Sequence, residues 1–163
     1  MKRFSATQKG FVTGLLILLV SAVTFWLKGN FENTVVLIAY FIYAAGIAWQ
    51  MLSFHQEHKG ATFRQYFQQG FKTFIIVTLI MVCATWLFLK FNNGMIESMV
   101  NNQRNLLKQD KNIAAAEIES HLATYRKFIL PGYTMAAVLS YLGIGTLISF
   151  LLGIFLSMKQ HKR

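Results

Sequence analysis

The chain has 163 residues, of which 55% are apolar and 15% aromatic, while only 13% are charged. This balance excludes an ordinary soluble domain, because such domains carry about twice that share of charged residues. The formal net charge of +10 does not indicate a nucleic-acid partner, since the basic residues lie between long apolar runs rather than on a folded polar surface.

Four apolar runs are long enough to cross a bilayer. A spanning α-helix needs about 20 mostly apolar residues, because the hydrocarbon core is about 30 Å thick. Within the four runs the only ionisable side chain besides Cys83 and the tyrosines is Lys72, at the start of the third. The sequence therefore predicts an all-α integral membrane four-helix bundle, a single membrane domain over residues 1–163, with spans at 11–27, 35–54, 71–89 and 132–158.

The first run has an alternative interpretation as a secretory signal peptide, because Lys2 and Arg3 precede it. Lys28, Gly29 and Asn30 follow Leu27, and no pair of small residues marks a cleavage point there. We therefore expect the first run to be retained as a span.

The basic residues predict the orientation of the spans. Four spans place both termini on one side, and lysine and arginine are retained preferentially in the cytoplasm. The side of the termini holds nine basic residues and one acidic residue, and the other side holds seven basic and five acidic residues. We expect both termini on the cytoplasmic side.

An aromatic stripe precedes the third span. Its members recur at helical spacing opposite glutamines and basic residues, which predicts an interfacial helix over 61–70. We expect the stripe to anchor the bundle, with recognition of lipid or of a partner as the alternative. The predicted anchor residues are Phe63, Tyr66, Phe67 and Phe71.

The connection between spans three and four is long and has helical character. Two amphipathic segments predict an extramembrane helical hairpin over 94–130. Asn92, Asn93 and Gly94 predict the break before it, residues 109–112 the turn, and Pro131 with Gly132 the exit into span four. The apolar stripes face either each other or a partner protein.

Span four carries small residues at every fourth position, which allow close approach of another helix. Span one has a shorter version of this pattern. We favour packing within the monomer, with a homo-oligomer as the alternative. The residues are Gly145, Ser149, Gly153 and Ser157 in span four, and Gly10 and Gly14 in span one.

The sequence contains only weak motifs for catalysis or metal binding. His55 and His58 flank Glu57, but a closed zinc site needs about four ligands. The spans contain serines and threonines but no general base that could activate them, which argues against catalysis. The deepest strongly polar side chain is Gln50, which cannot carry a proton, and this argues against proton-coupled transport. Cys83 has no second cysteine with which to pair. We predict no enzyme activity, cofactor or metal.

The residues that lead into the third span carry a family resemblance: Gly60, Thr62, Phe63, Phe67, Gly70 and Phe71, followed by the apolar run and Trp86. With four spans and a helical insertion between the last two, the chain resembles a bacterial family of unknown function found chiefly in Bacteroidota. The resemblance implies an inner-membrane location and carries no activity.

Two functional hypotheses follow. The first is an interaction or accessory subunit in the lipid bilayer that binds another membrane or periplasmic protein. The alternative is a small oligomeric channel or carrier for uncharged solutes, because the spans are rich in glycine, serine and threonine.

Overall fold

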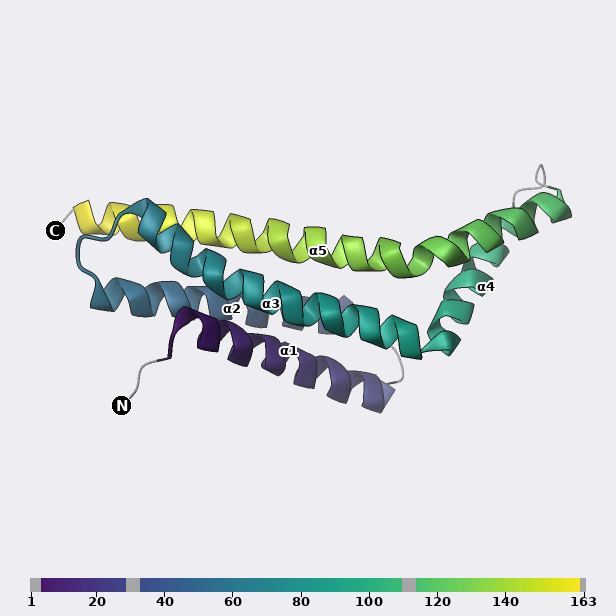
Figure 1. The fold of residues 1–163 in the computed structure, drawn as a ribbon, viewed down its shortest axis with the longest axis horizontal. Coiled ribbons are helices and arrows are strands. Elements are labelled where there is room, and N and C mark those ends of the chain that lie inside the picture. The colour runs from purple at the N-terminus through teal and green to yellow at the C-terminus, as the bar shows by residue number, and fades with distance from the viewer. Residues whose placement is uncertain (1–3, 29–32, 110–113, 162–163) are drawn as a thin grey trace. The chain divides into compact units, whose positions relative to one another are not determined.

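A computed structural model describes residues 4–28, 33–109 and 114–161 (Figure 1). These residues contain no strand. They form the α-helices α1 (Ala6–Lys28), α2 (Asn33–Glu57), α3 (Phe63–Phe91), α4 (Asn93–Gln109) and α5 (Ala115–His161). Every helix except α4 is long and apolar enough to cross a membrane, which confirms the predicted all-α fold with four spans.

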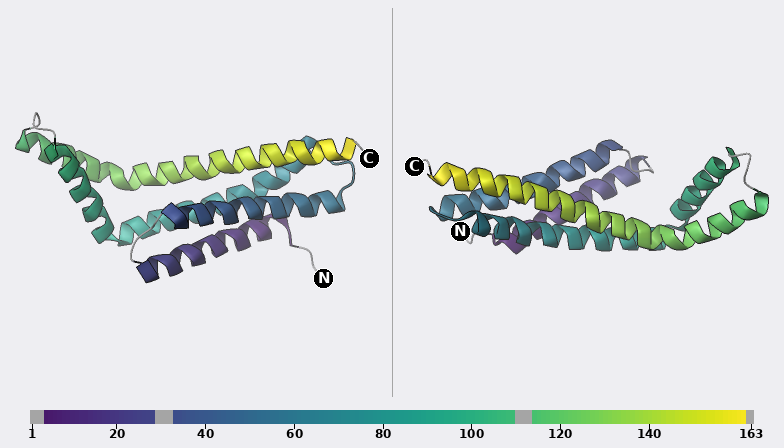
Figure 2. Two further views of the ribbon diagram at one scale, coloured as in Figure 1. Left: turned by 180° about the vertical axis from the view of Figure 1, so that it is seen from behind. Right: turned by 90° about the horizontal axis from the view of Figure 1, so that it is seen from above.

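The chain forms two compact units. Unit 1 comprises Met1–Met81 and Leu139–Arg163, and unit 2 comprises Val82–Val138. Within unit 1, α1, α2, the first part of α3 and the last part of α5 lie side by side (Figures 1 and 2). Unit 2 contains the end of α3, all of α4 and the first part of α5.

Two helices of unit 1 begin with side-chain caps, and the cap of α1 is a reciprocal capping box. The backbone nitrogen of Ser5 donates to Gln8 Oε1 at 2.9 Å, and Gln8 nitrogen donates to Ser5 Oγ at 3.3 Å. At α3, the backbone nitrogen of Thr62 donates to Gln65 Oε1 at 2.8 Å. Such caps satisfy amides that a helix start leaves unbonded. Before α3, Gly60 has a φ of 92°, a left-handed conformation that favours glycine.

The core of unit 1 is apolar and aromatic. Buried side chains from α1, α2, α3 and α5 form one cluster, which includes Ile17, Tyr43, Phe74 and Leu156. The buried hydroxyl of Tyr43 donates to the carbonyl oxygen of Tyr141 at 2.8 Å and so joins α2 to α5. Burial of a tyrosine hydroxyl is tolerated when it finds such a partner.

Two boundaries differ from expectation. The predicted interfacial helix 61–70 and span three are one continuous helix, α3, because Gly70 lies inside the helix with no breaking residue beside it. The expected exit at Pro131 and Gly132 also lies within one helix, α5. Proline removes only one backbone donor, the one that would bond the Lys127 carbonyl oxygen, and the helix continues on both sides of it.

The predicted break before the hairpin is present. Asn92 lies between α3 and α4, and its Oδ1 accepts a hydrogen bond from Met95 nitrogen at 3.1 Å. This is the geometry of a helix N-cap. The predicted turn residues 110–112 lie outside the described part of the chain, and Gln109 is the last residue of α4.

We expect Asn92→Ala to destabilise the first turn of α4 by about 1 kcal/mol, because the Met95 amide loses its side-chain acceptor and keeps only the Asn92 carbonyl oxygen, at 3.2 Å. Hydrogen exchange at Met95 should then be about fivefold faster. Asn93→Ala is the matched control, since the exposed Asn93 side chain makes no described hydrogen bond. Equal acceleration in both variants would contradict the cap.

Candidate functional site

The small-residue stripe of α5 lies against other helices of the same chain. A Cβ atom built on Gly145 would collide with the Tyr43 hydroxyl and would lie 2.8 Å from Phe74 Cβ. Ser149 is fully buried and packs beside Gly70. Gly153 faces the ring of Phe63, at 3.1 Å from a built Cβ. The stripe is therefore occupied by packing within unit 1.

The remaining small residues divide between packing and surface. On α1, a Cβ on Gly10 would lie 2.8 Å from the Thr73 carbonyl oxygen, and one on Gly14 would lie 2.7 Å from Ile80 Cδ1. Ser157 is only partly buried, and its hydroxyl donates to the Ile154 carbonyl oxygen at 2.9 Å. Gly10 and Gly14 thus bring α1 close to α3.

The predicted aromatic anchors do not form one surface. Tyr66 is fully buried, and its hydroxyl lies 2.6 Å from His55 Nδ1. Phe63 meets Phe150 edge to face at 5.5 Å between ring centroids. Phe67 is half-buried, whereas Phe71 is 46% exposed. Tyr66 and Phe63 are packing residues, and Phe71 is the one anchor residue that is exposed.

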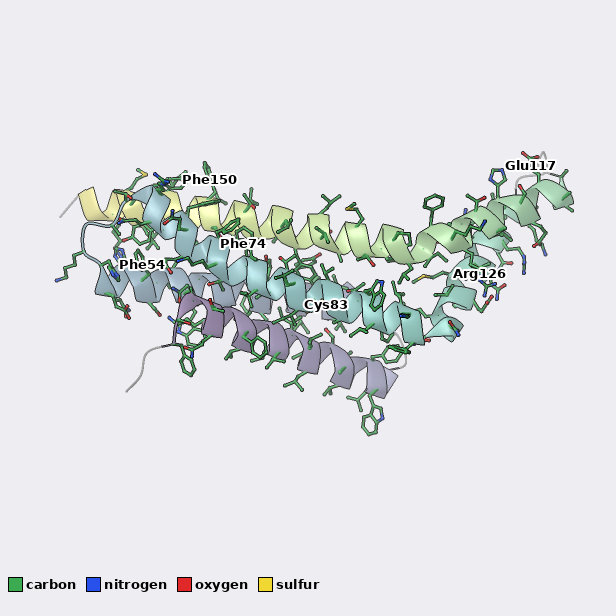
Figure 3. All side chains as sticks on the ribbon, in the orientation of Figure 1. Phe54, Phe74, Cys83, Glu117, Arg126 and Phe150 are labelled. Carbon is green, nitrogen blue, oxygen red and sulfur yellow. The ribbon has the colours of Figure 1, made fainter. Side chains whose placement is uncertain are left out.

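The histidines considered as metal ligands have other contacts. His55 lies against Tyr66, and His58 stacks on Phe54 with 4.2 Å between ring centroids. Within residues 4–28, 33–109 and 114–161, no three histidine, cysteine, aspartate or glutamate side chains come together. Cys83 is exposed on α3 (Figure 3).

The hairpin of unit 2 has its own apolar core. Val100 of α4 packs with Ile118, Leu122 and Ile129 of α5. Two ion pairs join the helices: Arg104 Nη2 lies 3.1 Å from Glu119 Oε2, and Arg126 pairs with Glu97. Figure 3 shows Arg126 and Glu117 on this part of α5. The apolar stripes therefore face each other, and the hairpin is held together by its own side chains.

A groove remains on the outside of the hairpin. Its volume is about 560 Å³, and its walls come from both helices. The lining side chains repeat at one-turn spacing along each helix, so the groove follows the helix axes. They are Gln103 and Leu107 of α4, and Ser120, His121, Thr124, Tyr125 and Phe128 of α5. Phe128 is 66% exposed, which leaves a large apolar ring uncovered beside polar groups.

A second pocket, of about 380 Å³, lies in unit 1 at the end where α1 begins. It contains groups that a membrane helix rarely buries, since Lys9 and Gln50 are each only 6% exposed. The sequence identified Gln50 as the deepest strongly polar side chain. Lys9 was counted there only among the nine basic residues on the side of the termini. Their meeting depends on how α1, α2 and α3 pack.

The comparison with family models places most of the chain in one family. Residues 8–158 match the model of a family described as Protein of unknown function (DUF4199). No curated protein and no solved structure matches the chain. The family description assigns no activity, so the groove and the pocket are the features that bear on function.

Proposed function

We propose that this chain, which belongs to the family described as Protein of unknown function (DUF4199), is a non-enzymatic interaction subunit of a bacterial inner membrane. The bias of basic residues supports cytoplasmic termini. The hairpin follows the third span, so this orientation puts it on the periplasmic side.

The groove between α4 and α5 carries this proposal. The hairpin core and its two ion pairs hold the groove walls in place without a partner. A preformed surface binds more strongly than one that must be ordered first, because less conformational entropy is lost. The exposed ring of Phe128 supplies an apolar anchor of the kind that dominates binding energy in interfaces.

An amphipathic helix of a second protein is the occupant that fits this groove. Along each helix of the hairpin the groove residues recur once per turn. A third helix can therefore lie in the groove parallel to the two helix axes. The three described acidic residues of the hairpin are engaged with Arg104, Arg126 and His121. Lys108 and Lys127 meet no carboxylate among the described residues, so an acidic flank on the partner helix would complement them.

Site-specific photocrosslinking tests the proposal. We expect p-benzoylphenylalanine at Thr124, inside the groove, to give an adduct with an acidic amphipathic helix of one protein. The same probe at Ala123, which is exposed beside the groove, should give no such adduct. Ser120→Trp should fill the groove and reduce the Thr124 adduct about tenfold.

Three outcomes would count against the proposal. They are equal adducts at positions 123 and 124, an adduct unaffected by Ser120→Trp, or an adduct on a second copy of this chain. Hydrogen exchange of the hairpin in Ser120→Trp shows that the helices remain folded, because an unfolded hairpin would lose its amide protection.

The channel alternative receives less support from the packing. The interior of unit 1 is filled by the cluster that contains Ile17, Tyr43, Ile47 and Phe74. A path for solutes would therefore have to form between copies of the chain.

A further inference from the structure

The polar pocket of unit 1 holds a lysine ammonium in an unusual setting. Lys9 comes from the first turns of α1 and is 6% exposed. Its Nζ lies 5.1 Å from the centroid of the Trp49 ring. Burial of a charge costs free energy unless opposite charge or hydrogen bonds compensate it. The negative face of the indole ring compensates only part of this cost.

Other charged groups line the same pocket as Lys9. Glu57 of α2 interacts electrostatically with Lys9, and Lys72 of α3 adds a second ammonium. His58 stacks on Phe54 at the same pocket wall. Among the described lining residues, two ammonium groups against one carboxylate give the pocket an excess of positive charge.

Gln50 supplies a buried polar atom that no described residue satisfies. Its Nε2 donates to Gln69 Oε1 at 3.1 Å, while its Oε1 is buried without a hydrogen-bond partner. Both side chains line the pocket. A half-turn of both amides keeps their mutual bond and puts the Gln50 N–H₂ group in the place of the unsatisfied oxygen. The pair can thus present a donor to an anion.

The start of α1 adds a third source of positive potential. Ser5, Ala6 and Thr7 line the pocket, and they form the cap and first turn of α1. The N-terminus of a helix carries a partial positive charge and unbonded amides, and both attract anions. The helix end, the ammonium groups and the amide of Gln50 therefore converge on one volume.

We propose that this pocket binds a phosphate group, supplied either by the headgroup of an anionic phospholipid or by free phosphate. A phosphodiester carries one negative charge, which matches the excess charge of Lys9, Lys72 and Glu57. Phe4 and Phe54 form apolar wall beside these groups, as a lipid glycerol backbone would require. Basic pockets between membrane helices bind anionic headgroups by this chemistry.

Ligand titrations of the full chain in uncharged detergent test the proposal. The probes are dioctanoyl-phosphatidylglycerol, dioctanoyl-phosphatidylcholine and inorganic phosphate, with thermal stability and binding as readouts. We expect phosphatidylglycerol to bind about tenfold more tightly than phosphatidylcholine, because the choline ammonium opposes Lys9. If phosphatidylglycerol binds and inorganic phosphate does not, the lipid is the source of the phosphate group. If inorganic phosphate binds tightly, the free anion is the source.

Lys9→Met and Gln50→Met should each weaken binding of the preferred phosphate probe about tenfold. Lys59→Met is the matched control, because Lys59 is exposed in the loop before α3 and does not line the pocket. Lys9→Met removes a buried ammonium and keeps a side chain of similar length, and its electrostatic partner Glu57 is exposed, so no buried carboxylate is left uncompensated and we expect the variant to fold.

The proposal is overturned if no probe binds, if phosphatidylcholine binds as well as phosphatidylglycerol while inorganic phosphate does not bind, or if Lys9→Met and Lys59→Met behave alike. The groove proposal concerns unit 2 alone, so neither result decides the other.

Discussion

Gly145→Leu should destabilise the chain by about 3 kcal/mol, because the new side chain has no space. The Cβ of Phe74 is attached to the backbone of α3 and cannot rotate away from a built Cβ at 2.8 Å. The Tyr43 hydroxyl on the other side is held by its bond to Tyr141. To admit leucine, α5 must move away from α2 and α3. Thermal unfolding in detergent should show a fall in Tm of roughly 10 °C.

Gly143→Leu is the control for this experiment. Gly143 lies on the same helix, and a Cβ atom at this position would meet nothing within 4 Å. We expect its stability to stay within about 0.5 kcal/mol of the parent. If the two variants unfold at the same temperature, the stripe does not pack within the chain as described.

Leu122→Ala should open the hairpin of unit 2. Leu122 is 3% exposed and contributes to the cluster around Val100, so truncation removes apolar contacts and leaves a cavity. The expected loss is about 3 kcal/mol. Amide protection of α4 should fall about a hundredfold, because helices of this length depend on tertiary packing. Hydrogen exchange with mass spectrometry measures this change.

Leu106→Ala makes the same chemical change on the hairpin surface. Leu106 is 61% exposed, so truncation removes little buried area. We expect less than about 0.5 kcal/mol of change and nearly unchanged exchange. A large effect of Leu106→Ala with none from Leu122→Ala would mean that the hairpin packs through its opposite face.

The spans and the break at Asn92 could be predicted because they depend on local signals. Apolar run length identifies a span, and an asparagine before a helix identifies a cap. Helix continuity at Gly70 and Pro131 could not be predicted in this way. Gly70 gives Ser149 room to pack against α3, so its role lies in a distant contact rather than in the local backbone.

The candidate sites were predictable only in part. Four-residue spacing identified the stripe from Gly145 to Ser157, and the contacts of Gly145 with Tyr43 and Phe74 explain why it is internal. The pocket could not be predicted, because Lys9, Gln50 and Gln69 belong to three different helices. Only packing brings these polar groups together, and periodicity along one helix carries no information about it.

The caps of α1 and α3 also affect how the helices fit the bilayer. Bonds to Gln8 and Gln65 satisfy the backbone amides of Ser5 and Thr62 from within the chain, so these two amides do not depend on water. By rise per residue, the 23 residues of α1 extend about 35 Å and the 29 residues of α3 about 44 Å. The longer α3 can fit the same hydrocarbon core as α1 by tilting or by starting in the interface, where its cap already satisfies the Thr62 amide.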